Sequence, residues 1–228
     1  MLKQLGIHPG SPVIVFMGGA AKMAADAGIR LEQAIHDGVA RAAVDLEASV
    51  VDGGTDSGTM SWLNTALRER HHHGVYIGVA PDSLTHLPDQ PANGHLEPLG
   101  DAHTHFVLVE GEKWGDELKP MYALVNALAA GVPSVGILVN GGKGTQEEVE
   151  ENVIDDRKVV VLEGSGRLAD KISLQLRYPG TISDADVQKI SREGDFAIFD
   201  IEMDPAQLAN KIKEYLAVYP KIAVSLRA

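Results

Sequence analysis

The 228-residue chain contains no cysteine. Disulfide bonds, thiolate metal sites and cysteine nucleophiles are therefore excluded from its chemistry. The absence of cysteine suits a reducing compartment, so we expect the protein to be cytoplasmic. The N-terminal segment also lacks the apolar core of a signal peptide. No apolar run approaches the roughly 20 residues that span a bilayer, and we expect no association with a membrane.

Basic side chains are scarce. Lysine and arginine together number 20, against 32 aspartates and glutamates, and the formal net charge is −12. Proteins that bind DNA or RNA usually carry a basic face that neutralises several phosphates, so a nucleic-acid partner is disfavoured. A small anion held by backbone N–H groups remains compatible with an acidic surface, because that attraction is local. We therefore expect a small anionic ligand.

Short β-branched runs alternate with stretches of helical periodicity along the chain. Strands are predicted at residues 13–16, 49–51, 75–79, 105–109, 134–139, 158–162 and 196–199. Helices are predicted at residues 35–46, 60–67, 118–128, 168–176 and 208–219. This alternation predicts an α/β, Rossmann-like fold, with a mostly parallel sheet covered by helices on both faces. No low-complexity linker divides the chain, so we expect a single domain over residues 1–228.

Residues 81–103 interrupt the alternation, with four prolines and little periodicity. A loop of this length in a compact domain is usually a lid, a binding loop or an interface arm. A solvated surface excursion is the alternative.

Glycine-rich loops follow several of the predicted strands. The carboxyl ends of parallel strands meet at one edge of a sheet, where ligands of open α/β folds bind. Glycines let the backbone approach an anion, and the next helix offers unpaired N–H groups. The candidate ligand-binding residues on these loops are Gly18, Gly19, Gly53, Gly54, Thr55, Ser57, Gly58, Thr59, Gly141, Gly142, Gly144, Thr145, Gly164, Ser165, Gly166 and Arg167. Neither the dinucleotide-binding fingerprint nor the Walker spacing is present, and tight turns at helix starts are the alternative explanation.

The histidines and one glutamate allow two interpretations each. His103 and His105 flank the start of a predicted strand, where they either touch a ligand or anchor the strand. His71, His72 and His73 are consecutive, so they cannot face one ion, and we predict no metal site and no cofactor. Thr145 and Glu148 have the T-x-x-E spacing of a capping box, which predicts a small effect of Glu148→Gln on stability. Alternatively, Glu148 is a catalytic carboxylate.

Five motifs occur in an order that resembles a known family. They are Gly-Gly-Ala at residues 18–20, DGGTDSGTM at 52–60, HTHFVLVE at 103–110, GGKGT at 141–145 and VVLEGSGRLAD at 160–170. Together they resemble the ligand-sensing N-terminal domain of TRPM cation channels, in its free-standing prokaryotic form within the SLOG superfamily. The resemblance covers roughly residues 12–175, and the remaining C-terminal residues fit as a continuation of the fold.

The resemblance implies a domain that senses a nucleotide derivative such as ADP-ribose or a cyclic form of it. A free-standing sensor needs a homo-oligomer or an unidentified effector protein to deliver its signal. The superfamily also includes LOG-type phosphoribohydrolases, which cleave nucleoside monophosphates at the N-glycosidic bond and carry a PGGxGTxxE motif. Here Gly141, Gly142, Gly144, Thr145 and Glu148 match that motif, while Asn140 replaces the proline. The arginine that these enzymes use has no counterpart in residues 111–128, so binding is favoured over hydrolysis.

Overall fold

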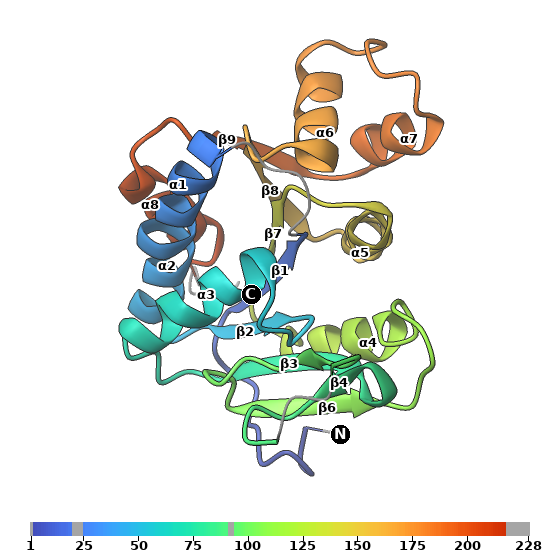
Figure 1. The fold of residues 1–228 in the computed structure, drawn as a ribbon. Coiled ribbons are helices and arrows are strands. Elements are labelled where there is room, and N and C mark those ends of the chain that lie inside the picture. Colours follow the sequence, from blue (N-terminus) through green and yellow to red (C-terminus); the bar gives the residue numbers. More distant parts are fainter. Residues whose placement is uncertain (1, 20–24, 91–93, 218–228) are drawn as a thin grey trace, which may run out of the picture.

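The computed structural model describes residues 2–19, 25–90 and 94–217. Its centre is a seven-stranded parallel sheet with the strand order β6-β3-β2-β1-β7-β8-β9 (Figure 1). The bounds of these strands are β1 Val13–Gly18, β2 Ser49–Asp52, β3 Tyr76–Pro81, β6 His105–Val109, β7 Ser134–Val139, β8 Lys158–Glu163 and β9 Phe196–Asp200. The predicted α/β class and its parallel sheet are confirmed, and each predicted strand is present within two residues of its expected bounds.

Helices cover both faces of the sheet (Figure 1). One face carries α1 (Ala25–Gln33), the π-helix η1 (Ala34–Ala40), α2 (Arg41–Asp45), α3 (Gly58–Glu69) and α8 (Pro205–Tyr215). The other carries α4 (Leu118–Leu128), α5 (Lys143–Ile154), α6 (Arg167–Arg177) and α7 (Ala185–Glu193). Helix α7 was not predicted, and the segment expected as one helix from residue 35 contains a π-helical stretch. No helix in the described ranges has both the length and the apolar character required to cross a membrane.

The central strand β1 shows why the sheet needs two helical layers. Ile14 and Phe16 pack in the core beneath α3 and α8, while Val13, Val15 and Met17 pack in the core beneath α4 and α5. All five side chains are fully buried. Because successive strand residues point to opposite faces, a run of apolar residues without alternation is stable only when both faces are covered.

The strand order reverses beside β1. Strands β2, β3 and β6 lie on one side of it, and β7, β8 and β9 lie on the other. The connections from β1 and β7 therefore leave the sheet in opposite directions, which opens a crevice at the carboxyl ends of these two strands. The topology thus places the glycine loops after β1, β2 and β7 at one position on the sheet edge.

The described part of the segment between β3 and β6 lies against this edge. It contains the 3₁₀-helix η2 (Asp82–Leu84) and two short parallel strands, β4 (Thr85–His86) and β5 (Glu97–Pro98). Leu99 is buried and forms a bridge with Thr55 in the loop after β2. Residues 97–103 are therefore part of the wall at the sheet edge.

Candidate functional site

A cleft of about 550 Å³ opens at the carboxyl ends of β1 and β2. Its floor is formed by Gly18 at the end of β1 and Gly53 after β2, and one wall is the first turn of α5. Six of the predicted ligand-binding residues line it, namely Gly18, Gly53, Thr55, Ser57, Gly144 and Thr145, and so does the catalytic candidate Glu148. The glycine loops after β2 and β7 therefore meet around one cavity.

A close approach explains the glycine at the cleft floor. A Cβ atom built on Gly18 would lie only 2.2 Å from the Thr59 hydroxyl oxygen. The buried Thr59 hydroxyl has no hydrogen-bond partner within the described part of the chain. Thr59 does not line the cleft but supports its floor from α3.

A second, smaller hollow of about 320 Å³ lies on the other side of the α5 N-terminus. It is lined by Gly141, Gly142 and Arg167 among the predicted residues, and shares Lys143 with the larger cleft. Lys171 also lines it. Of the three cationic side chains Lys143, Arg167 and Lys171, only Lys171 forms an ion pair within the described ranges, with Asp184 at 3.5 Å. Gly19 lies behind this hollow, because a Cβ atom there would be 3.5 Å from Gly141 Cα. Ala20, part of the first motif, lies outside the described residues.

The glycine loop after β8, residues 164–167, supports the smaller hollow. Ser165 is buried, and its hydroxyl accepts from the Asn140 backbone N–H at 2.8 Å and donates to the Leu162 carbonyl at 2.5 Å. Gly166 is the N-cap of α6, and the Gly164 N–H donates to Asp170 Oδ1 at 2.7 Å. These contacts join the ends of β7 and β8, so Arg167 alone from this loop faces the hollow.

Arg167 has a φ of +49°, in the left-handed region that side chains rarely adopt. Glycine would take this conformation without the steric cost. An arginine held there beside two glycine-rich turns is a strained residue of the kind that concentrates at functional sites.

The two predicted histidines lie outside the cleft. His103 is buried behind its floor, where Nε2 is 2.9 Å from Asp52 Oδ1. His105 begins β6 at the opposite end of the sheet, and its Nε2 is 3.1 Å from the Leu5 carbonyl oxygen. Gly54 is held by its N–H, which donates to Asp52 Oδ1 at 2.8 Å, and Gly58 begins α3 with a φ of +57°.

The capping box proposed for Thr145 and Glu148 is wrong. Helix α5 begins at Lys143 with Gly142 as its N-cap, so Thr145 is already in the first turn. No side chain caps this helix end. The helix begins earlier than the sequence suggested because the chain turns at Gly141, where φ is +100°. Glu148 is thereby placed in the second turn, facing the cleft.

Burial governs the chemistry of Glu148. Loss of solvation raises the pKa of its carboxyl group to about 8, with smaller contributions from the negative charges of Glu117 and Asp52. The pKa of Glu117 is also raised, mainly by burial. A carboxyl group with such a pKa is largely protonated at neutral pH, and it can then donate a hydrogen bond.

Several cleft residues were not predicted from the sequence. Trp114, Glu97, Glu117 and Glu147 all line the cleft, as does the shared Lys143. Trp114 is half exposed (50%) in a chain in which aromatic residues make up only 5%. A large exposed aromatic side chain after a strand is the one signal that could have identified it.

No arginine lies in α4, as the sequence indicated, and a tyrosine lies behind Glu148. Tyr122 is buried, and its hydroxyl accepts from Asn152 Nδ2 at 2.6 Å. Asn152 in turn accepts from Arg157 at 3.0 Å. The guanidinium of the buried Arg157 thus forms its hydrogen bonds with other side chains of the protein. Over the described ranges, no cluster of His, Asp and Glu side chains has the arrangement of a metal site.

Comparison with known proteins identifies the family of this chain. The family described as "SLOG in TRPM, prokaryote" matches residues 11–210. The chain belongs to this family. The resemblance carried by the five motifs is confirmed, and at the level of the family the chain is a ligand-sensing SLOG domain.

Animal channels are among the relatives of this SLOG domain. It is 28% identical over 181 residues to transient receptor potential cation channel subfamily M member 1 of Mus musculus, which covers 65% of this chain and 11% of the channel. It is 24% identical over 251 residues to subfamily M member 2 of Rattus norvegicus, covering 94% of this chain and 16% of the channel. The SLOG domain thus corresponds to a small part of these channels.

The turn that starts α5 gives a prediction about stability. Gly141→Ala should lower the free energy of unfolding by roughly 2 kcal/mol or more, because alanine is strained at positive φ and overpacked there. Its Cβ atom would lie 2.8 Å from Thr145 Cγ2. A melting temperature lower by roughly 4–8 °C would be the corresponding measurement.

Gly142→Ala is the matched control. Its φ is −114°, and the three atoms nearest to a Cβ atom there all belong to the flexible guanidinium end of Arg167. The control should melt close to the wild type. Equal melting of the two variants would show that the left-handed turn at Gly141 is not required.

Proposed function

We propose that this SLOG domain binds a nucleotide derivative of the ADP-ribose type across the two adjoining hollows. The observation that carries the proposal is their division of charge around the shared Lys143. The larger cleft is lined by Glu97, Glu117, Glu147 and Glu148, and the smaller hollow is lined by Lys143, Arg167 and Lys171. A ligand with a hydroxyl-rich sugar at one end and a diphosphate beside it matches this division.

The smaller hollow suits the diphosphate. The N-termini of α5 and α6 lie beside it, where unpaired backbone N–H groups and the helix dipoles favour anions. The guanidinium of Arg167 adds charge-assisted hydrogen bonds. These attractions act over a few ångströms, so they can outweigh the repulsion of a distant net charge of −12, which salt screens.

The larger cleft suits the nucleoside. The exposed ring of Trp114 offers a planar surface for a base, and base–aromatic stacking contributes about 1–3 kcal/mol per base. Ionised carboxylates accept hydrogen bonds from ribose hydroxyls, and a protonated Glu148 can donate one. The volume of about 550 Å³ is in the usual range of small-molecule sites.

Thermal unfolding with a series of nucleotides tests this proposal. ADP-ribose at a hundredfold excess over its Kd should stabilise the protein by about 2.7 kcal/mol, or roughly 5–11 °C for a chain of this size. ADP should stabilise it less, and adenosine least, because each lacks contacts that the two hollows offer together. Equal shifts from adenosine and ADP-ribose would refute the assignment of the smaller hollow to phosphate.

A pair of variants assigns the effect to this hollow. Arg167→Gln should reduce the ADP-ribose shift strongly, whereas Lys171→Gln should reduce it little, because Lys171 is already paired with Asp184. Both variants remove one positive charge, so a difference between them reports on contact and not on net charge.

Hydrolysis of the N-glycosidic bond is a second candidate function, and Glu148 is the observation that favours it. A carboxyl group with a pKa of about 8 in a ligand cleft has the property of a general acid. Incubation of the wild type with AMP or ADP-ribose, followed by product analysis, distinguishes the two functions. Release of free base that is lost in Glu148→Gln would establish the hydrolase, and intact ligand would leave the binding function.

A further inference from the structure

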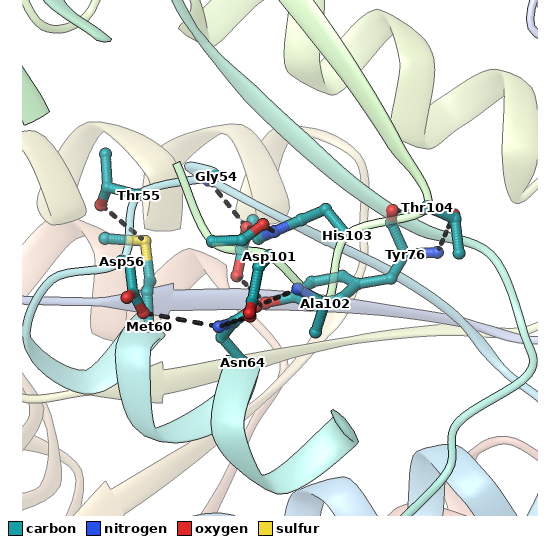
Figure 2. Close-up of polar contacts among 12 residues, drawn as sticks. Gly54, Thr55, Asp56, Met60, Asn64, Tyr76, Asp101, Ala102, His103 and Thr104 are labelled. Atoms are coloured by element: carbon teal, nitrogen blue, oxygen red, sulfur yellow. Dashed lines mark hydrogen bonds and ion pairs between the residues drawn. The ribbon is translucent and has the colours of Figure 1, made fainter. Parts of the chain in front are cut away.

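A buried cluster of polar side chains lies behind the cleft floor, outside the residues that face the proposed ligand. Its centre is the contact between His103 and Asp52, whose side chains are both completely buried. Asp52 ends β2, directly before the cleft residue Gly53, and His103 precedes β6. Figure 2 shows His103 beside Tyr76 and the Gly54 loop.

An oxygen atom lies at hydrogen-bond distance from each ring nitrogen of His103. Its Nδ1 lies 2.9 Å from the Gly100 carbonyl oxygen, which can only accept. Its Nε2 lies 2.9 Å from Asp52 Oδ1. That oxygen already accepts from the Gly54 N–H at 2.8 Å, and the other Asp52 oxygen accepts from the Tyr76 hydroxyl at 2.7 Å. Each ring nitrogen thus lies within hydrogen-bond distance of an oxygen that can accept, an arrangement that fits a ring donating from both nitrogens to the Gly100 carbonyl and the Asp52 carboxylate.

Aromatic rings enclose this pair. The Tyr76 ring stacks on His103 with 3.7 Å between the ring centres, and the centre of the Phe106 ring is 5.1 Å away. Stacking favours a cation over the ring face. The pKa of Tyr76 is raised well above its ordinary value, mainly by burial and then by the charge of Asp52, so the phenol stays neutral and donates.

The pair connects two walls of the cleft. Through Asp52 it holds Gly54, and through the carbonyl oxygen it holds Gly100, whose N–H in turn donates to the Gly54 carbonyl at 2.9 Å. Thr55 directly follows Gly54, Glu97 lies three residues before Gly100, and both line the cleft. A shift of His103 would therefore move both walls.

A second set of contacts, made by Asn64, holds the loop after β2 and the segment before β6 (Figure 2). Asn64 of α3 accepts from the Ala102 N–H at 2.9 Å and donates to Asp101 and Asp56 at 3.2 and 3.4 Å. Gly100 has no room for a side chain, because a Cβ atom there would lie 2.7 Å from Asn64 Oδ1 and 3.1 Å from His103 Cε1. The segment after β5 is thus fixed from α3 and from β2.

We propose that His103 is a positioning residue of the nucleotide cleft, which as an imidazolium joins Asp52 to Gly100 and so holds the loops carrying Thr55 and Glu97 in place. This rests on the proposed function for its effect on ligand affinity, whereas the charged pair itself is a property of the ligand-free protein. The ligand class concerned is the ADP-ribose type of nucleotide derivative.

The ligand-free wild type provides the first test. Long-range nitrogen–proton NMR spectra at pH 7 should show hydrogen on both ring nitrogens of His103, as for an imidazolium. A neutral ring, with one nitrogen bare, would overturn the charged pair. This measurement requires no variant and no ligand.

The second test compares two histidine variants. His103→Gln keeps a donor toward Asp52 but loses the donor to Gly100, while His105→Gln removes a histidine that lies outside the cleft and contacts Leu5. In the ligand-free protein, His103→Gln should speed hydrogen exchange at the Gly54 and Gly100 amides, and His105→Gln should leave both unchanged. Unchanged exchange in His103→Gln would overturn the positioning role.

Calorimetric titration with ADP-ribose, well below each melting temperature, completes the test. His103→Gln should weaken binding by about tenfold or more, as for a lost hydrogen bond to a charged group, and His105→Gln by less than about twofold. Equal affinities of the two variants would overturn the role of His103 in the site. Failure of the wild type to bind ADP-ribose would instead refute the proposed function. The exchange and NMR results would still show whether His103 and Asp52 form a charged pair that holds the two loops.

Discussion

Gly144→Leu is expected to weaken ADP-ribose binding by at least about a hundredfold, equivalent to about 2.8 kcal/mol. Gly144 lies in the first turn of α5 and lines the cleft, and a Cβ atom there would meet no protein atom within 4 Å. A leucine side chain would therefore occupy the space of the ligand without a clash in the empty protein. Leucine is also the better helix former, so the melting temperature without ligand should not fall.

Gly28→Leu is the matched control for this variant. Gly28 lies in α1, and a Cβ atom there also meets nothing within 4 Å, but this residue does not line the cleft. Calorimetric titration of both variants should show binding lost in Gly144→Leu and retained in Gly28→Leu. Normal affinity in Gly144→Leu would refute the cleft as the binding site.

Glu148→Gln is expected to stabilise the ligand-free protein at pH 7 by up to about 3 kcal/mol, or roughly 6–12 °C in melting temperature. In the native state burial raises the pKa of Glu148 to about 8, from an ordinary value of 4.5. Between these two values the unfolded chain has released the proton and the native chain retains it. The native state thus binds more protons, and its stability falls as the pH rises from about 4.5 to about 8. Glutamine has no such proton and removes this loss.

The measurement is the melting temperature of wild type and variant between pH 4.5 and 9. The two should agree at the acid end and diverge as the pH rises. Glu97→Gln is the control, because it removes another carboxylate that lines the cleft but is exposed, and its stability should stay within about 0.5 kcal/mol of the wild type. Parallel curves for Glu148→Gln and wild type would show that the Glu148 carboxyl group is solvated.

The same proton affects the ligand. A protonated Glu148 does not repel a phosphate and can donate a hydrogen bond to a ribose oxygen. The ionised form repels a phosphate and cannot donate. Affinity of the wild type for ADP-ribose should accordingly decrease as the pH rises through about 8. The carboxyl group that costs stability at neutral pH is therefore placed where a ligand can use it, as is common at functional sites.

The sequence by itself determined the strands, most of the helices and the sheet edge on which the glycine loops lie. Strand positions follow from the apolar runs, because a strand covered on both faces must be apolar along its length, as β1 is. The carboxyl-edge position of the loops then follows from parallel strands alone. The five motifs were sufficient to identify the family, since they preserve their order along the chain.

Only the tertiary structure decided where helix α5 begins, which residues of separate loops are in contact, and which side chains are buried. The T-x-x-E spacing predicted a cap at Thr145, but a cap depends on where the chain leaves the turn, and a left-handed Gly141 starts the helix two residues before Thr145. The contact between His103 and Asp52 joins residues 51 positions apart, and no local pattern encodes it. Glu117, which raises the pKa of Glu148, and Glu97 line the same cleft from separate connections. Solvation and charge depend on distances in space, so a residue type and its spacing cannot reveal that one glutamate in this acidic chain has a pKa near 8.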